Sequence, residues 1–212
     1  LVGSTLLWAD LRNGFVWAVL FITCGYGALD FADDWLKVTK RNTKGVSGKL
    51  KLIVQGGLGV IAALWLTWLM PGALADKLAF PIFKEFLLPL GILFPLLAAL
   101  VMMGSSNAVN LTDGLDGLAI VPVMIAATVF ALIAYLVGNR VFADYLQLHY
   151  VPGTGELAVF CAALVGAALL GLLAELGPGP GSGPISPIAA PAALALLLAG
   201  HETTANWLTW TW

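Results

Sequence analysis

The feature that most constrains this chain is a series of apolar runs, each about as long as a helix must be to cross a bilayer. A helix needs about 20 apolar residues to span the hydrocarbon core. Five runs meet that length, and a sixth is interrupted by His201 and Glu202. The five are residues 14–32, 52–70, 86–104, 117–137 and 157–175, and the sixth is 189–212. The pattern predicts an all-α, polytopic integral membrane protein with five to six transmembrane helices.

The composition excludes several other classes of protein. Hydrophobic residues make up 60% of the 212 residues and charged residues only 10%, whereas a soluble domain carries about 25% charged residues. This excludes an ordinary cytosolic domain and a disordered chain, and two cysteines are too few for a disulfide scaffold. A net charge of -2 gives no basic footprint for nucleic acid. The expected surroundings are therefore a lipid bilayer, with no nucleic-acid partner.

Basic residues are concentrated between the first two apolar runs. Six of the ten Lys and Arg residues lie in segment 33–51: Lys37, Lys40, Arg41, Lys44, Lys49 and Lys51. The positive-inside rule places this segment in the cytoplasm. Counting crossings from there puts 71–85 and 138–156 outside, and 105–116 and 176–188 inside. Two acidic segments, 31–34 and 110–116, are thereby predicted on one membrane face.

Asp33 and Asp34 are expected to end a helix just before the basic segment. A carboxylate at a helix C-terminus is disfavoured by the helix dipole. One interpretation is a solvated helix end whose charges pair with Lys37 or Arg41. The other is a site for a divalent metal or for phosphate chemistry, because Mg²⁺ usually takes one or two carboxylates plus substrate phosphates. Both interpretations stay open at this point.

The second acidic segment contains Asn110, Asp113 and Asp116, which recur every third residue and would share one face of a helical turn. The alternative is a capping turn, in which Thr112 or Asp113 caps the helix that follows. The two interpretations are compatible.

Lysines add positive charge to the same predicted face. Lys44, Lys49 and Lys51 could hold a pyrophosphate, or they could be ordinary positive-inside charges. Carboxylates, lysines and an asparagine at a membrane surface suit the transfer of a phosphorylated group from a soluble donor to a lipid acceptor. Such a reaction depends mostly on positioning and charge neutralisation.

The stretch SSNAVNLTDGLDGLAI at residues 105–120 closely resembles the signature of the phospho-N-acetylmuramoyl-pentapeptide transferase family. That family belongs to the polyprenyl-phosphate N-acetylhexosamine-1-phosphate transferases. Supporting stretches occur in the family's order at residues 5–10, 31–38, 42–45 and 155–166. The resemblance covers residues 4–171, so we expect residues 1–171 to form a transferase-like transmembrane core.

The resemblance implies part of a ten-span helical membrane enzyme. Members of the family transfer phospho-MurNAc-pentapeptide from UDP-MurNAc-pentapeptide to undecaprenyl phosphate, with Mg²⁺, and release UMP. This is the first membrane step of peptidoglycan synthesis, which serves cell-wall biogenesis, cell shape and cell division. The implied location is the bacterial inner (plasma) membrane, multi-pass, with the active face cytoplasmic. A homodimer is left open as a further partner.

Matching the motifs residue by residue implies roles for seven side chains. Asp33 and Asp34 fall on the family's catalytic pair, where one of them deprotonates the lipid phosphate or attacks the donor. The same two carboxylates are the candidate Mg²⁺ ligands. The remaining matches are candidate substrate-binding residues, with Asp113 expected to contact the uridine: Lys44, Lys51, Asn110, Asp113 and Asp116.

The sequence also departs from the family. Asp30 stands where a small residue such as glycine is usual, and on a helix it would neighbour Asp34. After about residue 171 the family's Gly-Asp-x-Gly-Ser stretch, whose Asp is a Mg²⁺ ligand, and its run of three histidines do not appear. We expect instead a Gly/Pro-rich linker at 172–188 and an atypical apolar, Trp-rich segment at 189–212, in a chain truncated relative to the family.

These departures leave two alternatives to the family's activity. One is a sister enzyme that uses a UDP-N-acetylhexosamine as donor. The other is a non-catalytic membrane fragment that binds nucleotide or partner helices without turnover, because an acid and the histidines of the family are missing. Loss of a metal ligand would remove several kcal/mol of transition-state stabilisation.

Overall fold

The computed structural model describes residues 1–40, 45–80, 86–113 and 119–175. These residues form two compact units, and the boundary between the units falls within helix α4. One unit is Asn13–Ala108, and the other combines Leu1–Arg12 with the chain from Val109 onward. Three sequence-based expectations lie outside the described residues: the roles of Lys44 and Asp116, the linker from residue 176 onward, and the sixth apolar segment 189–212.

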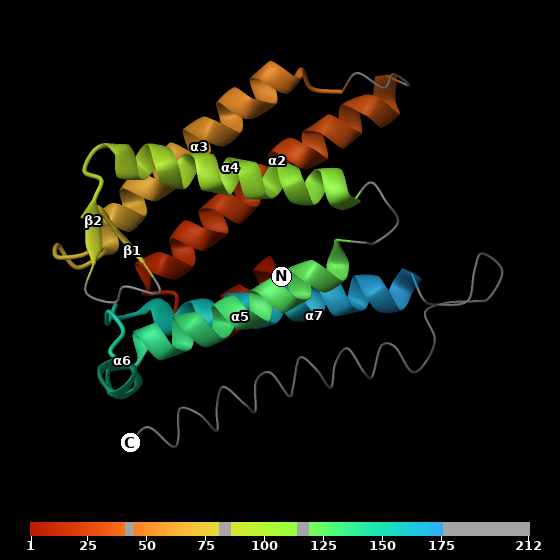
Figure 1. Ribbon diagram of the computed structural model, residues 1–212. Helices are drawn as coiled ribbons and strands as arrows, with labels where there is room; N and C mark the ends of the chain where they lie inside the picture. The colour runs from red at the N-terminus through yellow and green to blue at the C-terminus, as the bar shows by residue number, and fades with distance from the viewer. Residues whose placement is uncertain (41–44, 81–85, 114–118, 176–212) are drawn as a thin grey trace. The chain divides into compact units, whose positions relative to one another are not determined.

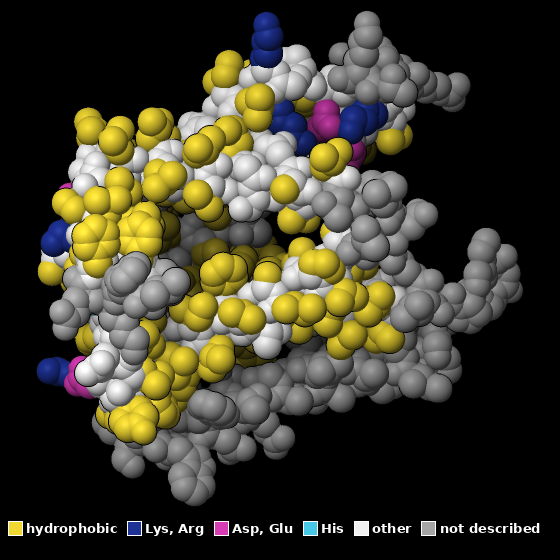
Figure 2. Space-filling model, viewed as in Figure 1, with side chains coloured by type: hydrophobic (Ala, Val, Ile, Leu, Met, Phe, Trp, Pro, Cys, Tyr) yellow, Lys and Arg dark blue, Asp and Glu magenta, His cyan; other side chains and the backbone are white. Residues whose placement is uncertain are grey.

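Long helices dominate the described part of the chain (Figure 1). They are α2 (Gly14–Lys40), α3 (Gly48–Leu69), α4 (Leu93–Asp113), α5 (Ile120–Gly138) and α7 (Leu157–Glu175). All five are long and apolar enough to cross a membrane. Figure 2 shows hydrophobic side chains spread over their outward faces, as expected for helices that contact lipid. The prediction of an all-α membrane protein with five to six transmembrane helices is confirmed, with five such helices among the described residues.

The remaining elements are short. They are α1 (Val2–Trp8), β1 (Lys77–Ala79), β2 (Leu87–Pro89), α6 (Arg140–Leu146) and the 3₁₀ helix η1 (Thr154–Glu156). The two strands pair antiparallel, with Leu78 opposite Leu88. The sequence does not predict these strands, because the apolar run 86–104 is long enough for one span. Pro89 has no N–H to continue a helix, and Gly91 has a φ of 52°. Helix α4 therefore begins only at Leu93.

Within the unit Asn13–Ala108, α2 and α3 lie side by side (Figure 1). Gly59 of α3 meets α4 closely, since a Cβ at this position would lie 3.1 Å from the Cα of Ala99. The side chain of Gln55 on α3 is fully buried. Its backbone oxygen accepts a hydrogen bond from the Tyr26 hydroxyl of α2 (2.9 Å), and its Oε1 accepts one from Asn107 Nδ2 of α4 (2.7 Å). Hydrogen bonds thus link the three apolar helices α2, α3 and α4.

In the other unit, α5 and α7 pack along each other with α1 against α7 (Figure 1). Gly138, at the end of α5, comes so close to η1 that a Cβ there would lie 2.8 Å from the Cα of Gly155. The backbone N–H of Asp10, just after α1, donates to Glu156 Oε2 at 2.9 Å. The close approach of Gly138 to Gly155 and the hydrogen bond from Asp10 to Glu156 thus connect the end of α5, the loop after α1 and η1.

Helix α2 is longer than the sequence analysis expected. It continues through Lys40, so Asp33 and Asp34 lie inside the helix and do not end it. The penalty expected from the helix dipole does not apply there, because the dipole acts mainly within the last turn. Lys37 pairs with both carboxylates from within the same helix. Paired charges let a helix continue beyond the end of its apolar run.

Helix α4 also extends beyond its expected end, through Asp113. The sequence predicts a connection at 105–116, and one of its two compatible interpretations has Thr112 or Asp113 capping the next helix. That interpretation is wrong, because both residues belong to α4 and the N-cap of α5 is Ala119, which makes no side-chain cap bond. Helix α7 ends at Glu175, past the expected core boundary at residue 171.

Candidate functional site

The candidate site is built around the adjacent acids of α2. Asp33 is nineteen positions beyond Gly14, which is about 28 Å along the helix at 1.5 Å per residue and close to the thickness of the hydrocarbon core, about 30 Å. The acids therefore sit at one end of the membrane-spanning length of α2, and the helix continues past them to Lys40.

Asp33 is held on both carboxylate oxygens. Its Oδ2 lies 2.6 Å from Lys37 Nζ, and its Oδ1 accepts a hydrogen bond of 2.6 Å from the backbone N–H of Val46. Its side chain is only 14% exposed. Asp33 thus ties the chain segment that precedes α3 to helix α2.

Asp34 has a different environment. Its Oδ1 lies 3.0 Å from Lys37 Nζ, and its side chain is 75% exposed. The Lys37 ammonium therefore contacts both acids, at i+4 and i+3 on the same helix. The pairing with Lys37 that the sequence analysis left open is present. Of the two acids, Asp34 is the one that a ligand can approach.

Gly45 is fitted against this acid pair. It has a φ of 45°, in the left-handed region that favours glycine. A Cβ at this position would collide with Asp33 Oδ1 and would lie 2.9 Å from Lys37 Cε. A glycine here lets the backbone approach the carboxylate closely enough for the Val46 N–H to donate to it.

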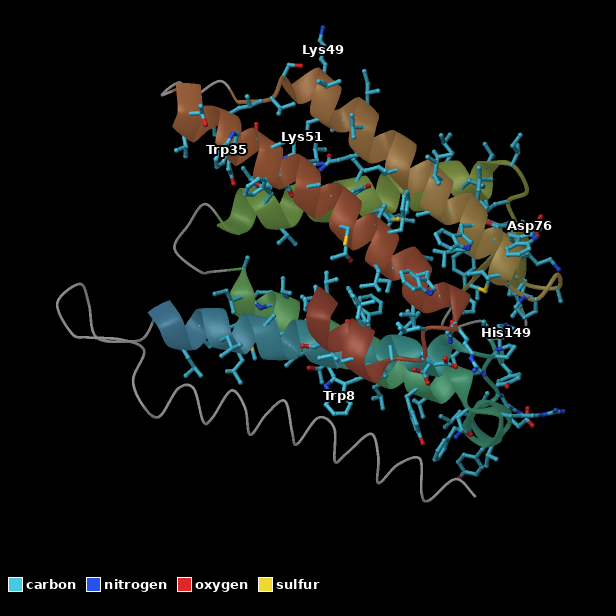
Figure 3. All side chains as sticks on the ribbon, turned by 180° about the vertical axis from the view of Figure 1, so that it is seen from behind. Trp8, Trp35, Lys49, Lys51, Asp76 and His149 are labelled. Carbon is cyan, nitrogen blue, oxygen red and sulfur yellow. The ribbon has the colours of Figure 1, made fainter. Side chains whose placement is uncertain are left out.

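Lys51, on the first turn of α3, pairs with Asp30 of α2. The distance from Lys51 Nζ to Asp30 Oδ1 is 2.7 Å, and the side chains are 16% and 34% exposed. Figure 3 shows Lys51 between α2 and α3, whereas Lys49 extends away from both. Asp30 and Asp34 both lie on α2, four residues apart as expected. The side chain of Asp30 also makes an ion pair with α3.

The nucleotide-side candidates lie on α4. Asn110 is exposed in the last turns of that helix. Asp113 is the last residue of α4, three positions further along the same helix. The expected helical spacing of these two residues is therefore present, but on the end of a long helix and not in a loop.

The donor set of the acid pair suits a hard cation only in part. Across the described residues, no group of three or more His, Cys, Asp or Glu side chains could hold a metal ion. Mg²⁺ usually takes one or two carboxylates and completes its shell with water and substrate phosphates. Asp33 and Asp34 fit such a shared site, with the exposed Asp34 carrying the readily accessible oxygens.

Two features of the site were not found from the sequence. The Asp30–Lys51 ion pair joins two helices, so no local spacing signals it. The fit of Gly45 against Asp33 depends on how the chain returns to α2, although the glycine itself stands in a stretch that carries the family resemblance. The pairing of Lys37 could be found, because it follows from helical spacing alone.

The chain matches the family model described as glycosyl transferase family 4 over residues 16–174. The phospho-N-acetylmuramoyl-pentapeptide-transferase of Granulibacter bethesdensis is 66% identical over 166 residues, which are 78% of this chain and 46% of the relative. The protein of that name from Gluconacetobacter diazotrophicus is 63% identical over 169 residues, 80% of this chain and 47% of the relative.

The chain spans about half the length of the curated relatives it matches. The matched residues 16–174 include the acid pair of α2, Lys51 and the signature stretch 105–120. The resemblance proposed from that signature is confirmed by these relatives. Because the family model matches most of its length, the chain belongs to glycosyl transferase family 4.

Proposed function

We propose that this chain transfers phospho-MurNAc-pentapeptide from UDP-MurNAc-pentapeptide to undecaprenyl phosphate and releases UMP. The observation that carries the proposal is the pair of adjacent acids, bridged by Lys37, near one end of the membrane-spanning length of α2. The acid pair occurs in a chain that is 66% identical over 166 residues to a phospho-N-acetylmuramoyl-pentapeptide-transferase. A soluble donor and a lipid acceptor can meet at such a position.

Asp34 is the proposed reactive carboxylate. It is the more exposed of the two acids, so it can accept the proton of the lipid phosphate. Asp33 positions Lys37 and the backbone of Val46 through its two oxygens, each of which can still bind a metal ion. Lys37 and Lys51 supply the positive charge that phosphoryl transfer needs to offset the phosphate oxygens.

Mg²⁺ is the proposed cofactor. Asp33 and Asp34 would hold it together with phosphate oxygens of the donor, and the ion would stabilise the negative charge on the transferring phosphoryl group. The two carboxylates would supply the protein ligands of the ion. Carboxylate oxygens are the hard ligands that Mg²⁺ prefers.

The proposed nucleotide side consists of Asn110 and Asp113 on α4, together with Asp116 of the signature stretch and Lys44 of the basic segment. Asn110 offers an exposed amide that can both donate and accept hydrogen bonds. Asp113 remains the proposed uridine contact. The proposed setting is the bacterial inner membrane with the acid pair on the cytoplasmic side, where the basic segment also lies by the positive-inside rule.

A donor panel tests the proposal. The full chain in nanodiscs is supplied with undecaprenyl phosphate, Mg²⁺ and one of two donors, UDP-MurNAc-pentapeptide or UDP-N-acetylglucosamine. Release of UMP and formation of the lipid-linked product are measured together. We expect turnover with the pentapeptide donor only.

The other results are equally informative. Turnover with UDP-N-acetylglucosamine alone would replace the proposal with a sister activity of the same superfamily. Nucleotide binding without turnover from either donor would contradict the proposed transfer. It would identify the chain as a non-catalytic membrane protein that keeps the site.

A further inference from the structure

The lysines that face the acid pair are engaged by carboxylates of the chain itself. Lys37 contacts Asp33 and Asp34, and Lys51 contacts Asp30. Asp30 has no place in the proposed transfer. Its carboxylate nevertheless lies 2.7 Å from Lys51, a proposed phosphate-binding cation.

We propose that Asp30 is an internal counter-ion for Lys51, which a phosphate or pyrophosphate group must displace in order to bind. The inference deepens the proposed function, since it concerns how the same site admits its anionic substrate. It makes Asp30 a residue that tunes affinity and takes no direct part in the chemistry.

Burial explains why Lys51 needs a counter-ion. Its side chain is 16% exposed, on the first turn of a membrane-spanning helix and packed against α2. An ammonium removed from water without a partner is costly, and ionisable groups among membrane helices are paired for this reason. Asp30 satisfies Lys51 without any external anion.

The same geometry makes Asp30 a competitor. A carboxylate 2.7 Å from Lys51 Nζ occupies one direction of approach to the ammonium, and its charge repels an incoming phosphate. An anion that replaces it leaves Lys51 paired. Asp30 is 34% exposed and can be solvated once released. The exchange thus leaves neither group as a buried unpaired charge.

The inference predicts opposite effects on stability and affinity when Asp30 loses its charge. Asp30→Asn should make the protein less stable in the absence of anion, because Lys51 loses its partner. It should also bind an anion at Lys51 more tightly, because the competitor is gone. A merely structural role for Asp30 would weaken both properties together.

Lysine labelling measures the effect without requiring turnover. The full chain in detergent is reductively methylated with formaldehyde and a borohydride, and the modification of each lysine is measured by mass spectrometry. Inorganic pyrophosphate is then titrated, and the concentration that half-protects Lys51 is recorded. Lys49, exposed and directed away from α2, is the internal reference.

In the original protein we expect Lys51 to react more slowly than Lys49. In Asp30→Asn, Lys51 should react faster, and the pyrophosphate concentration for half-protection should fall by about fivefold. Asp30→Gly should shift it in the same direction. Asp144→Asn removes an exposed carboxylate that pairs with Arg140 on α6, and it should leave the concentration unchanged.

An unchanged or higher half-protection concentration in both Asp30 variants would overturn the inference, as would the absence of protection by pyrophosphate in any variant. A failure of the proposed function is distinguishable from this. The donor panel could show no transfer while the half-protecting pyrophosphate concentration still falls about fivefold in the Asp30 variants. That result would support the counter-ion role of Asp30 and contradict the proposed transfer activity.

Discussion

At the residue scale, the two neighbouring acids of α2 differ more than their adjacency in the sequence suggests. Asp33 is 14% exposed and bound on both oxygens, whereas Asp34 is 75% exposed and contacts Lys37 through one oxygen. Successive residues on a helix point in different directions, so only one of the two turns toward the returning chain before α3. The asymmetry leaves Asp34 as the more accessible of the two acids.

The first prediction concerns Gly45. Gly45→Ala should destabilise the protein by about 1–3 kcal/mol, since its φ of 45° strains any residue with a Cβ and that Cβ would collide with Asp33 Oδ1. Gly48→Ala is the matched control, because nothing lies within 4 Å of a Cβ there. Thermal unfolding of both variants in detergent measures the difference. Equal unfolding temperatures would contradict the contact.

Residue types and helical spacing predicted part of this site. The acid pair and its bond to Lys37 follow from positions i, i+3 and i+4 of one helix. The Asp30–Lys51 pair does not, because it depends on which faces of α2 and α3 meet. Spacing within one helix carries no information about which faces of two helices pack together.

At the element scale, polar and small residues determine how α2, α3 and α4 associate. Lipid is as apolar as the outward side chains, so close packing and hydrogen bonds must hold such helices together. Gly59 permits a close approach to Ala99, and the buried Gln55 side chain bonds to Asn107. The hydroxyl of Tyr26 adds a bond from α2.

The second prediction tests the close approach. Gly59→Leu should destabilise the unit Asn13–Ala108 by about 1–3 kcal/mol, because a Cβ would already lie 3.1 Å from the Ala99 backbone. Gly57→Leu changes the same helix at an exposed glycine with nothing within 4 Å of a Cβ, and it should be nearly neutral. Unfolding of the reconstituted protein compares the two. If Gly59→Leu left the free energy of unfolding unchanged, α3 and α4 would not pack against each other at Gly59.

The third prediction tests the polar bond between α3 and α4. In a double-mutant cycle of Gln55→Met and Asn107→Ala, we expect a coupling free energy of about 0.5–1.5 kcal/mol, the range of interhelical hydrogen bonds in membranes. Thr67→Val is the control, since the Thr67 hydroxyl bonds within its own helix to Ala63 O. It should show no coupling to Asn107→Ala. A coupling indistinguishable from zero for Gln55 would refute the link.

Hydropathy predicted the existence of the long helices better than their ends. The run 157–175 coincides with α7. By contrast, α2 and α4 continue for several residues past their apolar runs. A helix requires hydrogen-bonded backbone groups, and its side chains do not have to be apolar. In α2, Lys37 neutralises the acids that would otherwise mark the end.

At the scale of the whole molecule, five membrane-spanning helices fix which connections share a side. Helix α3 has 22 residues and a length of about 33 Å, enough to place its two ends on opposite membrane surfaces. The concentration of basic residues at its beginning predicts that this end is cytoplasmic. The composition and the apolar runs were sufficient for this level of description.

The fourth prediction tests that topology. In a chain whose Cys24 and Cys161 are replaced by alanine, Lys49→Cys should react with an impermeant maleimide only from the cytoplasmic side. Ala73→Cys, exposed after the other end of α3, should react only from outside. Labelling of spheroplasts and of inverted vesicles distinguishes the sides. Both cysteines reacting from one side would contradict a spanning α3.

We propose that the acid pair of α2 performs phosphoryl transfer in this chain. The most direct measurement is Mg²⁺-dependent release of UMP from UDP-MurNAc-pentapeptide in the presence of undecaprenyl phosphate, compared among the original protein, Asp34→Asn, Asp33→Asn and Asp144→Asn. We predict a rate that requires Mg²⁺, falls by about a hundredfold or more in both acid-pair variants, and is unchanged in Asp144→Asn. Turnover that survives the loss of Asp33 and Asp34, or no turnover beside an active full-length relative, would contradict the claim.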